Sequence, residues 1–156
     1  MHRINLTELA AGPERDAPDG FRARMSRLGG DLGAKATGAT VYDLEPGQAV
    51  CPYHYEHGEE EWALAISGRP SVRAPEGTEE LAPLDLVFFQ PGPAGAHQIL
   101  NESQEPARVL MWSNVVYPTS TVYPDSDKVG VWTEDESEEI VVPRSARVDY
   151  YDGESR

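Results

Sequence analysis

The residues of this sequence that could do chemistry are concentrated between Cys51 and Glu61. This segment contains two histidines and four glutamates, and it leads directly into the apolar stretch Trp62–Ile66. Imidazole and carboxylate groups are typical protein ligands of Fe, Mn, Ni, Co and Zn. The composition of the segment therefore indicates a divalent-metal site that residues elsewhere in the chain complete.

The direction of each side chain separates the stronger ligand candidates from the weaker ones. Successive residues of an extended strand face opposite sides, so His54 and Glu56 share one face while His57 points to the other. His57 is therefore the weaker candidate. Glu59 and Glu60 are expected to be surface charges.

The stretch Glu61–Ser67 has the alternation of a half-buried strand. Glu61 shares a face with Ala63 and Ala65, so a strand that points Glu61 inward leaves room for a ligand beside it. The opposite face carries Trp62, Leu64 and Ile66. A large apolar stripe on an outer face must be covered, either by the ends of the chain or by a second copy of the protein.

The same residues also allow interpretations without a metal. Residues 56–61 can form a solvated acidic loop, and Cys51 is most simply a small buried hydrophobe rather than a reactive thiol. Arg69, Arg73 and Arg108 could recognise an anionic substrate if they pointed inward. Solvated strand positions are the simpler expectation for these three arginines.

Composition favours one all-β domain. The chain has 156 residues, 39% of them hydrophobic, with 13 prolines, 14 glycines and no long helical periodicity. The formal net charge of -14 disfavours nucleic acid and anionic membranes as partners. A single cysteine and the lack of an apolar run in the first thirty residues predict a soluble cytoplasmic protein.

The order of turn residues and apolar stretches predicts a series of short strands. They are expected at 21–28, 39–44, 61–67, 71–74, 79–82, 86–89, 96–100 and 107–112. The glycines at 29, 30 and 33 are expected to loosen the chain. Residues 1–20 are expected to be loosely held unless they lie across a neighbour, and the chain after Ser113 is expected to be an irregular acidic tail.

Two spaced patterns resemble the paired motifs of the cupin superfamily. The first is His54-x-Glu56-x4-Glu61-x6-Gly68, preceded by Gly47, and the second runs through Asp85, Pro91, a Gly-rich loop, His97 and Asn101. The resemblance covers roughly residues 38–114. The chain departs from it at two positions, because Glu56 replaces the second histidine of the first motif and Leu84 stands where the second motif has glycine.

This resemblance implies a double-stranded β-helix, or jelly-roll barrel, with an N-terminal extension over 1–37 and a C-terminal one over 115–156. It implies a divalent metal held by His54, Glu61 and His97, with Glu56 in the place of the missing histidine. Two carboxylates would neutralise the ion, and without it at least one of them should take up a proton because its pKa is raised.

The resemblance leaves two functions open. One is a metal-dependent enzyme that acts on a small organic molecule in the barrel interior by a dioxygenase-type or isomerase-type reaction. The other is a non-catalytic small-molecule or metal-binding module, such as a sensor. The apolar stripe, extended by Leu100, Leu110 and Trp112, further predicts a homodimer to which the strand at 21–28 contributes.

Overall fold

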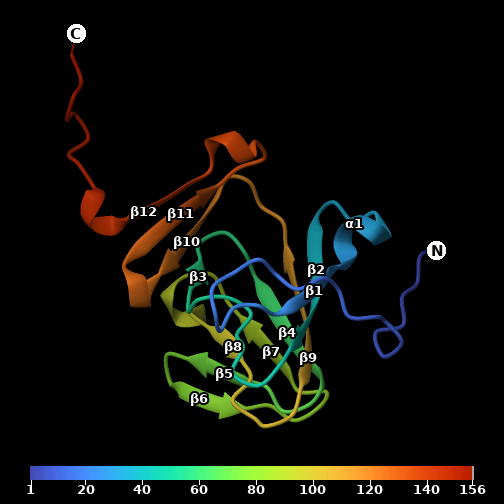
Figure 1. The fold of residues 1–156 in the computed structure, drawn as a ribbon. Helices are drawn as coiled ribbons and strands as arrows, with labels where there is room; N and C mark the ends of the chain where they lie inside the picture. The colour runs from blue at the N-terminus through green and yellow to red at the C-terminus, as the bar shows by residue number, and fades with distance from the viewer. Residues whose placement is uncertain (156) are drawn as a thin grey trace.

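Short antiparallel strands are the main regular elements of the computed structural model, which describes residues 1–155 (Figure 1). The strands are β1 (Arg24–Arg27), β2 (Thr37–Leu44), β3 (Tyr55–Glu56), β4 (Glu61–Ser67), β5 (Ser71–Ala74), β6 (Gly77–Glu80), β7 (Leu86–Phe89), β8 (Gln98–Leu100), β9 (Ala107–Asn114), β10 (Thr119–Tyr123), β11 (Lys128–Trp132) and β12 (Ile140–Pro143). The helices are α1 (Leu28–Leu32) and the 3-10 turns η1 (Pro93–Gly95), η2 (Pro124–Ser126), η3 (Glu136–Glu138) and η4 (Arg144–Ala146). The predicted all-β class is confirmed.

The strands form two facing layers. One layer is a five-stranded sheet with the order β1-β2-β9-β4-β7. The other combines the sheets β6-β5-β8 and β12-β11-β10-β3, which single bridges join where His54 pairs with His97 and Ala49 pairs with Leu100. Residues 49–56 therefore continue the second layer across its middle, and the first ligand candidates lie on it.

The core lies between the layers. Its cluster of buried apolar side chains comprises Ala23, Leu44, Val50, Ala63, Ala65, Val72, Leu81, Phe89, Ile99, Val109 and Met111. Ala63 and Ala65 face inward from β4, as the alternation predicts, while Trp62, Leu64 and Ile66 face the outer side and are half-buried. Ala63 and Ala65 are fully buried within this packed cluster.

Residues 21–33 differ from the predicted strand and loose glycine segment. Strand β1 covers only Arg24–Arg27, and α1 follows it directly. Gly33 ends the helix in the left-handed conformation at φ 74°, with its N–H on the carbonyl of Gly30. A glycine just after the last helical residue is a common stop signal, so Gly33 terminates a short helix here instead of loosening the chain.

The segment after Ser113 is not the irregular tail that was predicted. Strands β10, β11 and β12 form consecutive antiparallel pairs, and β10 also pairs with β3. The β-branched residues of Thr119–Tyr123 and Ile140–Val142 favour strands, and prolines and acidic turns between them obscured that pattern. This sheet brings β10 beside the metal-ligand candidate Glu56.

The N-terminal segment lies across the barrel rather than away from it. Glu14 forms a bridge with Arg24, and the N–H of Arg15 donates to the carbonyl of Ala23 at 3.2 Å. On the outer face, Arg108 donates to the carbonyls of Leu6 and Leu9. Among residues 1–155, no helix has the length and apolar character needed to cross a membrane.

Candidate metal centre

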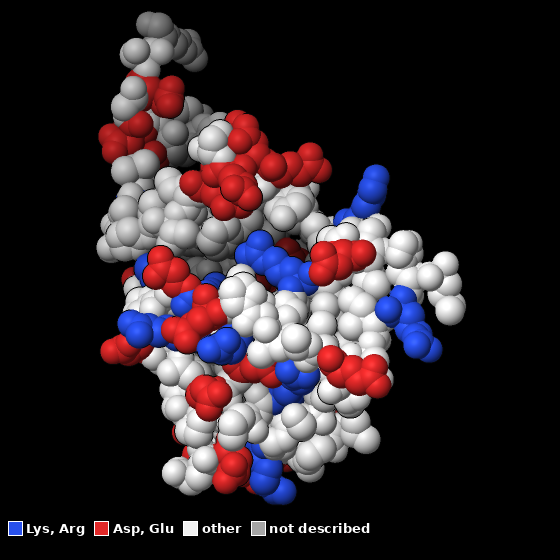
Figure 2. All heavy atoms as spheres, turned by 45° about the vertical axis from the view of Figure 1, so that its right-hand side comes forward, with Lys and Arg blue, Asp and Glu red and all other residues white. Residues whose placement is uncertain are grey.

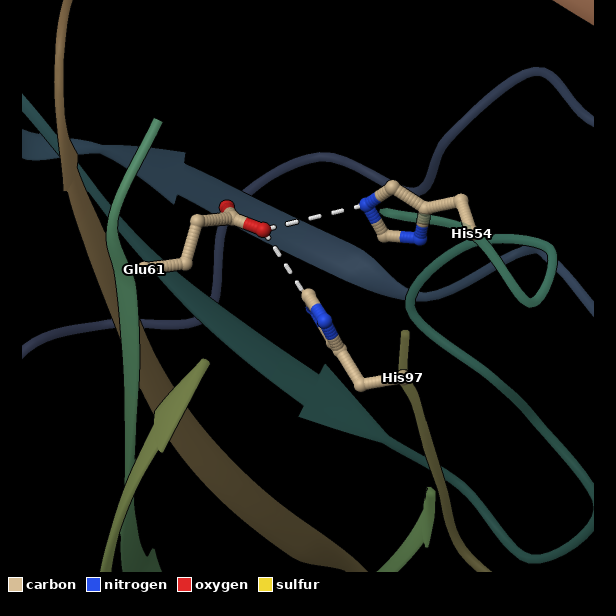
Figure 3. A group of neighbouring side chains, drawn as sticks. All are labelled: His54, Glu61 and His97. Carbon is tan, nitrogen blue, oxygen red and sulfur yellow. Dashed lines mark ion pairs between the residues drawn. The ribbon is translucent and has the colours of Figure 1, made fainter. Parts of the chain in front are cut away.

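Three of the four predicted ligands converge between the two layers. Glu61 begins β4 in one layer, while His54 and His97 pair through their main chains in the other, with N···O distances of 3.1 and 2.8 Å. One ligand atom from each residue lies within 4.8 Å of the others. Figure 3 shows both imidazoles directed at the Glu61 carboxylate.

Main-chain carbonyls fix the orientation of both imidazoles. His54 Nδ1 lies 3.0 Å from the carbonyl oxygen of Pro52, and His97 Nδ1 lies 3.0 Å from that of Gly95. A carbonyl can only accept, so each Nδ1 carries a proton, and each Nε2 is the ring atom directed at Glu61. This arrangement is typical of metal-binding histidines.

The atoms that face one another lack hydrogen-bond partners within the described chain. Glu61 Oε2 and His97 Nε2 are both buried without a partner, and they lie 3.3 Å apart. His54 Nε2 lies 3.8 Å from the same oxygen. Ligand atoms about 2.1 Å from a shared ion lie roughly 3 Å apart when at right angles, so the three side chains fit a divalent cation.

Packing holds His97 in place. Its side chain is almost fully buried, and its ring lies against Phe89 with centroids 3.7 Å apart and planes within 9° of parallel. The ring of His54 stacks less closely on Tyr123, at 6.1 Å. Rotation of His97 away from Glu61 would therefore disrupt the core, which makes this half of the site rigid.

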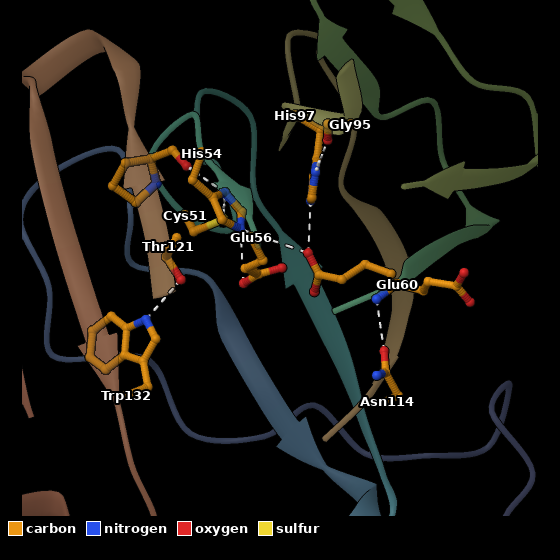
Figure 4. A network of polar contacts seen from close by, with 11 residues as sticks. Cys51, His54, Glu56, Glu60, Gly95, His97, Asn114, Thr121 and Trp132 are labelled. Carbon is orange, nitrogen blue, oxygen red and sulfur yellow. Dashed lines mark hydrogen bonds and ion pairs between the residues drawn. The ribbon is translucent and has the colours of Figure 1, made fainter. Parts of the chain in front are cut away.

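Glu56 lies beside the three-residue group but is not part of it. Its Oε1 atom lies 3.6 Å from His54 Nε2, and the side chain is largely buried (Figure 4). The group that brings one atom of each residue within 4.8 Å contains only His54, Glu61 and His97. Ligation of a metal by Glu56 therefore stays a prediction, whereas its place in the same cavity is a structural fact.

Burial and neighbouring ionisable groups shift the pKa values of the side chains in the site. Burial raises the pKa of Glu56, and the nearby charge of Glu61 adds to this effect. Burial also acts to raise the pKa of Glu61, but the nearby imidazole of His97 outweighs it, so that the pKa is lowered. Burial lowers the pKa of His54, but its polar contacts with Cys51 and Glu56 outweigh it and raise the pKa to about 12. In the metal-free protein, protons thus occupy the site and compete with a cation.

His57 and Glu59 were both expected to point away from the site. His57 is exposed and packs edge-on against Tyr55, away from the three-residue group. Glu59 is half-buried rather than the surface charge that was expected. Burial raises the pKa of Glu59 to about 7, and the charges of Glu56 and Glu61 add to this effect. Glu59 lies between β3 and β4, where strand alternation does not predict whether a side chain is buried.

A small cavity opens beside these residues. Its volume is about 260 Å³, and its walls include His54, Glu56 and Glu61 together with side chains of β2 and β9. The full lining is Arg15, Gly38, Ala39, Thr40, Tyr42, Val50, Cys51, His54, Glu56, Glu61, Met111, Trp112 and Ser113. Ligand pockets for drug-sized molecules begin near 300 Å³, so this cavity suits a smaller molecule.

Arg69, Arg73 and Arg108, considered for anion recognition, are paired elsewhere. Each donates to a carboxylate at 2.6 Å: Arg69 to Glu80, Arg73 to Asp125 and Arg108 to Asp43. Asn101, the last residue of the second motif, is buried and donates to the carbonyls of Leu44 and Glu105. It closes a turn outside the cavity. The arginine that does reach the cavity, Arg15, was not among the predicted candidates.

Comparison with known proteins gives a family match. The family model described as a cupin domain matches residues 40–113. No curated protein matches the chain. The match spans His54, Glu61 and His97, and it lies within the interval 38–114 in which the motifs occur.

Solved structures resemble nearly the whole chain. A proposed sugar phosphate isomerase from Acidithiobacillus ferrooxidans has a TM-score of 0.80 at 24% identity, over 92% of this chain and 91% of that one. A sugar phosphate isomerase of the cupin superfamily from Silicibacter pomeroyi has a TM-score of 0.79 at 21% identity, over 93% and 94%. The polyketide cyclase RemF from Streptomyces resistomycificus has a TM-score of 0.61 at 21% identity, over 76% and 83%. These similarities show the double-stranded β-helix fold.

Proposed function

The chain belongs to the cupin superfamily, and from this premise we propose that it is a metal-dependent enzyme that isomerises a small organic molecule. One observation carries the proposal: ligand atoms of His54, Glu61 and His97 converge beside a cavity, and those of Glu61 and His97 are buried without a hydrogen-bond partner. His54, Glu61 and His97 would hold the ion. A divalent ion there would polarise a substrate carbonyl or hydroxyl oxygen.

Glu56 is the residue in position to move a proton. Its carboxylate lines the cavity beside His54 and lies outside the three-residue ligand group. An isomerisation at a carbon next to a carbonyl needs a base that takes a proton from one carbon and returns it to another. Glu56 Oε1 or Oε2 would carry that proton between the two steps.

Two features favour an isomerase over an oxygenase. The carboxylate of Glu56, beside the ligand group, supplies the proton acceptor that isomerisation needs. Two similar structures, from Acidithiobacillus ferrooxidans and Silicibacter pomeroyi, are named as sugar phosphate isomerases, the first of them as a proposal. Sugar phosphates are accordingly the first compounds to assay.

Metal analysis and an exchange assay together test the proposal. Protein purified without an affinity column should contain about one equivalent of a divalent metal, and His97→Ala should contain none. The metal-loaded protein should exchange substrate C–H hydrogen with deuterium from solvent D2O, which NMR detects. Glu56→Gln should retain the metal and lose exchange. Metal binding without exchange for any sugar phosphate or hydroxy ketone would instead favour the non-catalytic binding module.

A further inference from the structure

The cavity contains one basic side chain that the proposed metal chemistry does not use. Among the residues that line it, Arg15 is the one lysine or arginine, and it lies on the N-terminal segment that crosses the barrel. One of its nitrogens, Nη1, donates to the carbonyl of Val50 at 2.8 Å. The main-chain N–H of Arg15 is held by Ala23, so both ends of the residue are fixed.

The guanidinium of Arg15 still has free donors. A guanidinium carries five N–H groups, and the bond to Val50 uses one of them. Within residues 1–155 Arg15 forms no ion pair, whereas Arg69, Arg73 and Arg108 each bind a carboxylate directly. The remaining donors of Arg15 are therefore available to a molecule in the cavity.

Charge balance indicates what such a molecule would carry. A divalent ion compensates the carboxylates of Glu56 and Glu61, which are the acidic groups among the cavity walls. The positive charge of Arg15 then has no counterpart inside the cavity. An anionic oxygen group would supply it, since a guanidinium binds carboxylate and phosphoryl oxygens through paired N–H donors.

Two hydroxyl groups add to the donors near Arg15. Thr40 and Tyr42 are alternate residues of β2, so their side chains share the inward face, and both line the same cavity. We propose that Arg15, with Thr40 and Tyr42, forms an anion subsite that binds a phosphoryl or carboxylate group of the substrate while the metal centre holds its reacting end. The inference rests on the proposed function and narrows the substrate to a small anionic compound.

The alternative to an anion subsite is a purely structural role for Arg15, in which its hydrogen bond to Val50 holds the N-terminal segment on the barrel. The two roles separate by experiment. Loss of a fastening contact lowers the melting temperature and leaves anion affinity intact, whereas loss of a subsite lowers anion affinity. Arg22 offers the matched control, because it lies on the same segment, bonds to Ala17 and Asp19, and is absent from the cavity walls.

Inorganic phosphate and acetate are suitable probes. Protein loaded with Mn²⁺ should broaden the 31P line of phosphate, or the 13C line of labelled acetate, because the paramagnetic ion lies near the bound anion. Arg15→Gln should weaken binding of the preferred anion about 10- to 100-fold, as expected for a charged hydrogen bond. Arg22→Gln should not change it. Higher salt should weaken binding to the wild type, because Arg15 is exposed.

Phosphate and acetate binding to the wild type and to Arg15→Gln distinguishes a phosphoryl subsite, a carboxylate subsite and the absence of a subsite. Dependence of phosphate binding on Arg15 identifies a phosphoryl subsite, and dependence of acetate binding identifies a carboxylate subsite. Equal affinity in wild type and Arg15→Gln, or no binding of either anion to the wild type, overturns the inference. If Mn²⁺ itself does not bind, the proposed function fails. Calorimetric titration of metal-free wild type and metal-free Arg15→Gln with the same anions still decides the role of Arg15.

Discussion

The Nε2 atom of His97 lies 3.3 Å from the Oε2 atom of Glu61, although the two residues come from opposite layers of the barrel. Neither atom has a hydrogen-bond partner in the described chain. Because a metal would satisfy both, replacing either residue or His54 with alanine should abolish stoichiometric binding. Metal content after gel filtration, measured by mass spectrometry, checks this expectation.

His57 provides the control for that experiment. It is close in sequence to His54, but its side chain is exposed and directed away from the site. His57→Ala should therefore keep the wild-type metal content. Loss of the metal in His57→Ala, with retention in His54→Ala, would show that the ligand set is misassigned.

Removal of the metal should destabilise the fold. The carboxylates of Glu56 and Glu61 share one largely buried site, and a bound cation offsets both their repulsion and their lost hydration. At a free metal concentration a thousandfold above the dissociation constant, binding stabilises the folded state by about 4 kcal/mol. That corresponds to a change in melting temperature on the order of 10 °C. Calorimetry with and without a chelator at neutral pH measures it, and equal melting temperatures would count against an occupied site.

Glu59 should make the metal-free protein less stable as the pH rises. Its pKa is raised from 4.5 to about 7, chiefly by burial. The folded state therefore favours the protonated form: its contribution to stability is complete below pH 4.5 and is lost as the pH rises through 7. Melting temperatures of the metal-free protein should fall over this interval, and Glu59→Gln should reduce the slope.

Glu60 is the matched control for Glu59. It is the next residue, its side chain is exposed, and only its main-chain N–H is engaged, by Asn114 at 2.7 Å (Figure 4). Glu60→Gln should retain the slope of the wild type. Parallel pH profiles for wild type and Glu59→Gln would show that Glu59 is hydrated in solution.

Alternation along strands was sufficient to predict much of the barrel and the inward direction of three ligand candidates, His54, Glu61 and His97. The inward face of β4 carries Glu61, Ala63 and Ala65 because side chains alternate over residues 61–65, before the register with β9 shifts. The same rule separates His54 from His57. It could not place Glu59 or Arg15, because the first lies in a turn and the second depends on where a distant segment crosses the barrel.

The net charge of the sequence predicts less about individual residues than strand alternation does. The net charge of -14 describes the whole chain, yet Figure 2 shows acidic and basic side chains intermixed over one face. The net charge does not show which basic side chains lie beside a cavity and which are paired with carboxylates. Arg15 forms part of a cavity, whereas Arg73 stacks on Tyr53 at 4.1 Å while it binds Asp125. Only the three-dimensional structure separates these roles.

Leu84 preserves the backbone of the motif glycine that it replaces. Its φ is 74°, in the left-handed region, and its side chain is exposed. The left-handed conformation costs an L-residue roughly 1–2 kcal/mol. Glycine avoids this cost, but the greater freedom of its unfolded chain offsets part of the gain in stability. Leu84→Gly should therefore raise the melting temperature by a few degrees. Leu84→Ala, which keeps the Cβ atom, should not, and an equal gain in both variants would assign the effect to the exposed leucine side chain.

The outer face of the five-stranded sheet carries a larger apolar stripe than the alternation of β4 alone indicated. Trp62 stacks on Trp112 at 5.9 Å and contacts Phe88 at 4.7 Å, and Leu64 pairs with Leu110 and Leu86. Leu86 and Phe88 are exposed by 54% and 43%. Leu100, predicted to extend the stripe, lies instead in β8 of the other layer. Strand β1 pairs with β2 at the far edge of the sheet from β7, so the exposed end of the stripe is not covered by it.

A second copy of the protein is the expected cover, through a two-fold contact of this face with itself. Burial of each large side chain contributes about 1.5–3 kcal/mol, so Phe88 and Leu86 with their neighbours can sustain such a contact. Phe88→Glu should shift the protein from dimer to monomer in sedimentation velocity without loss of metal, because the side chain points away from the site. Val141→Glu, an exposed apolar position on β12, is the control and should leave the dimer intact. A wild type that sediments as a monomer at all accessible concentrations would refute the dimer and leave Leu86 and Phe88 as ordinary exposed side chains.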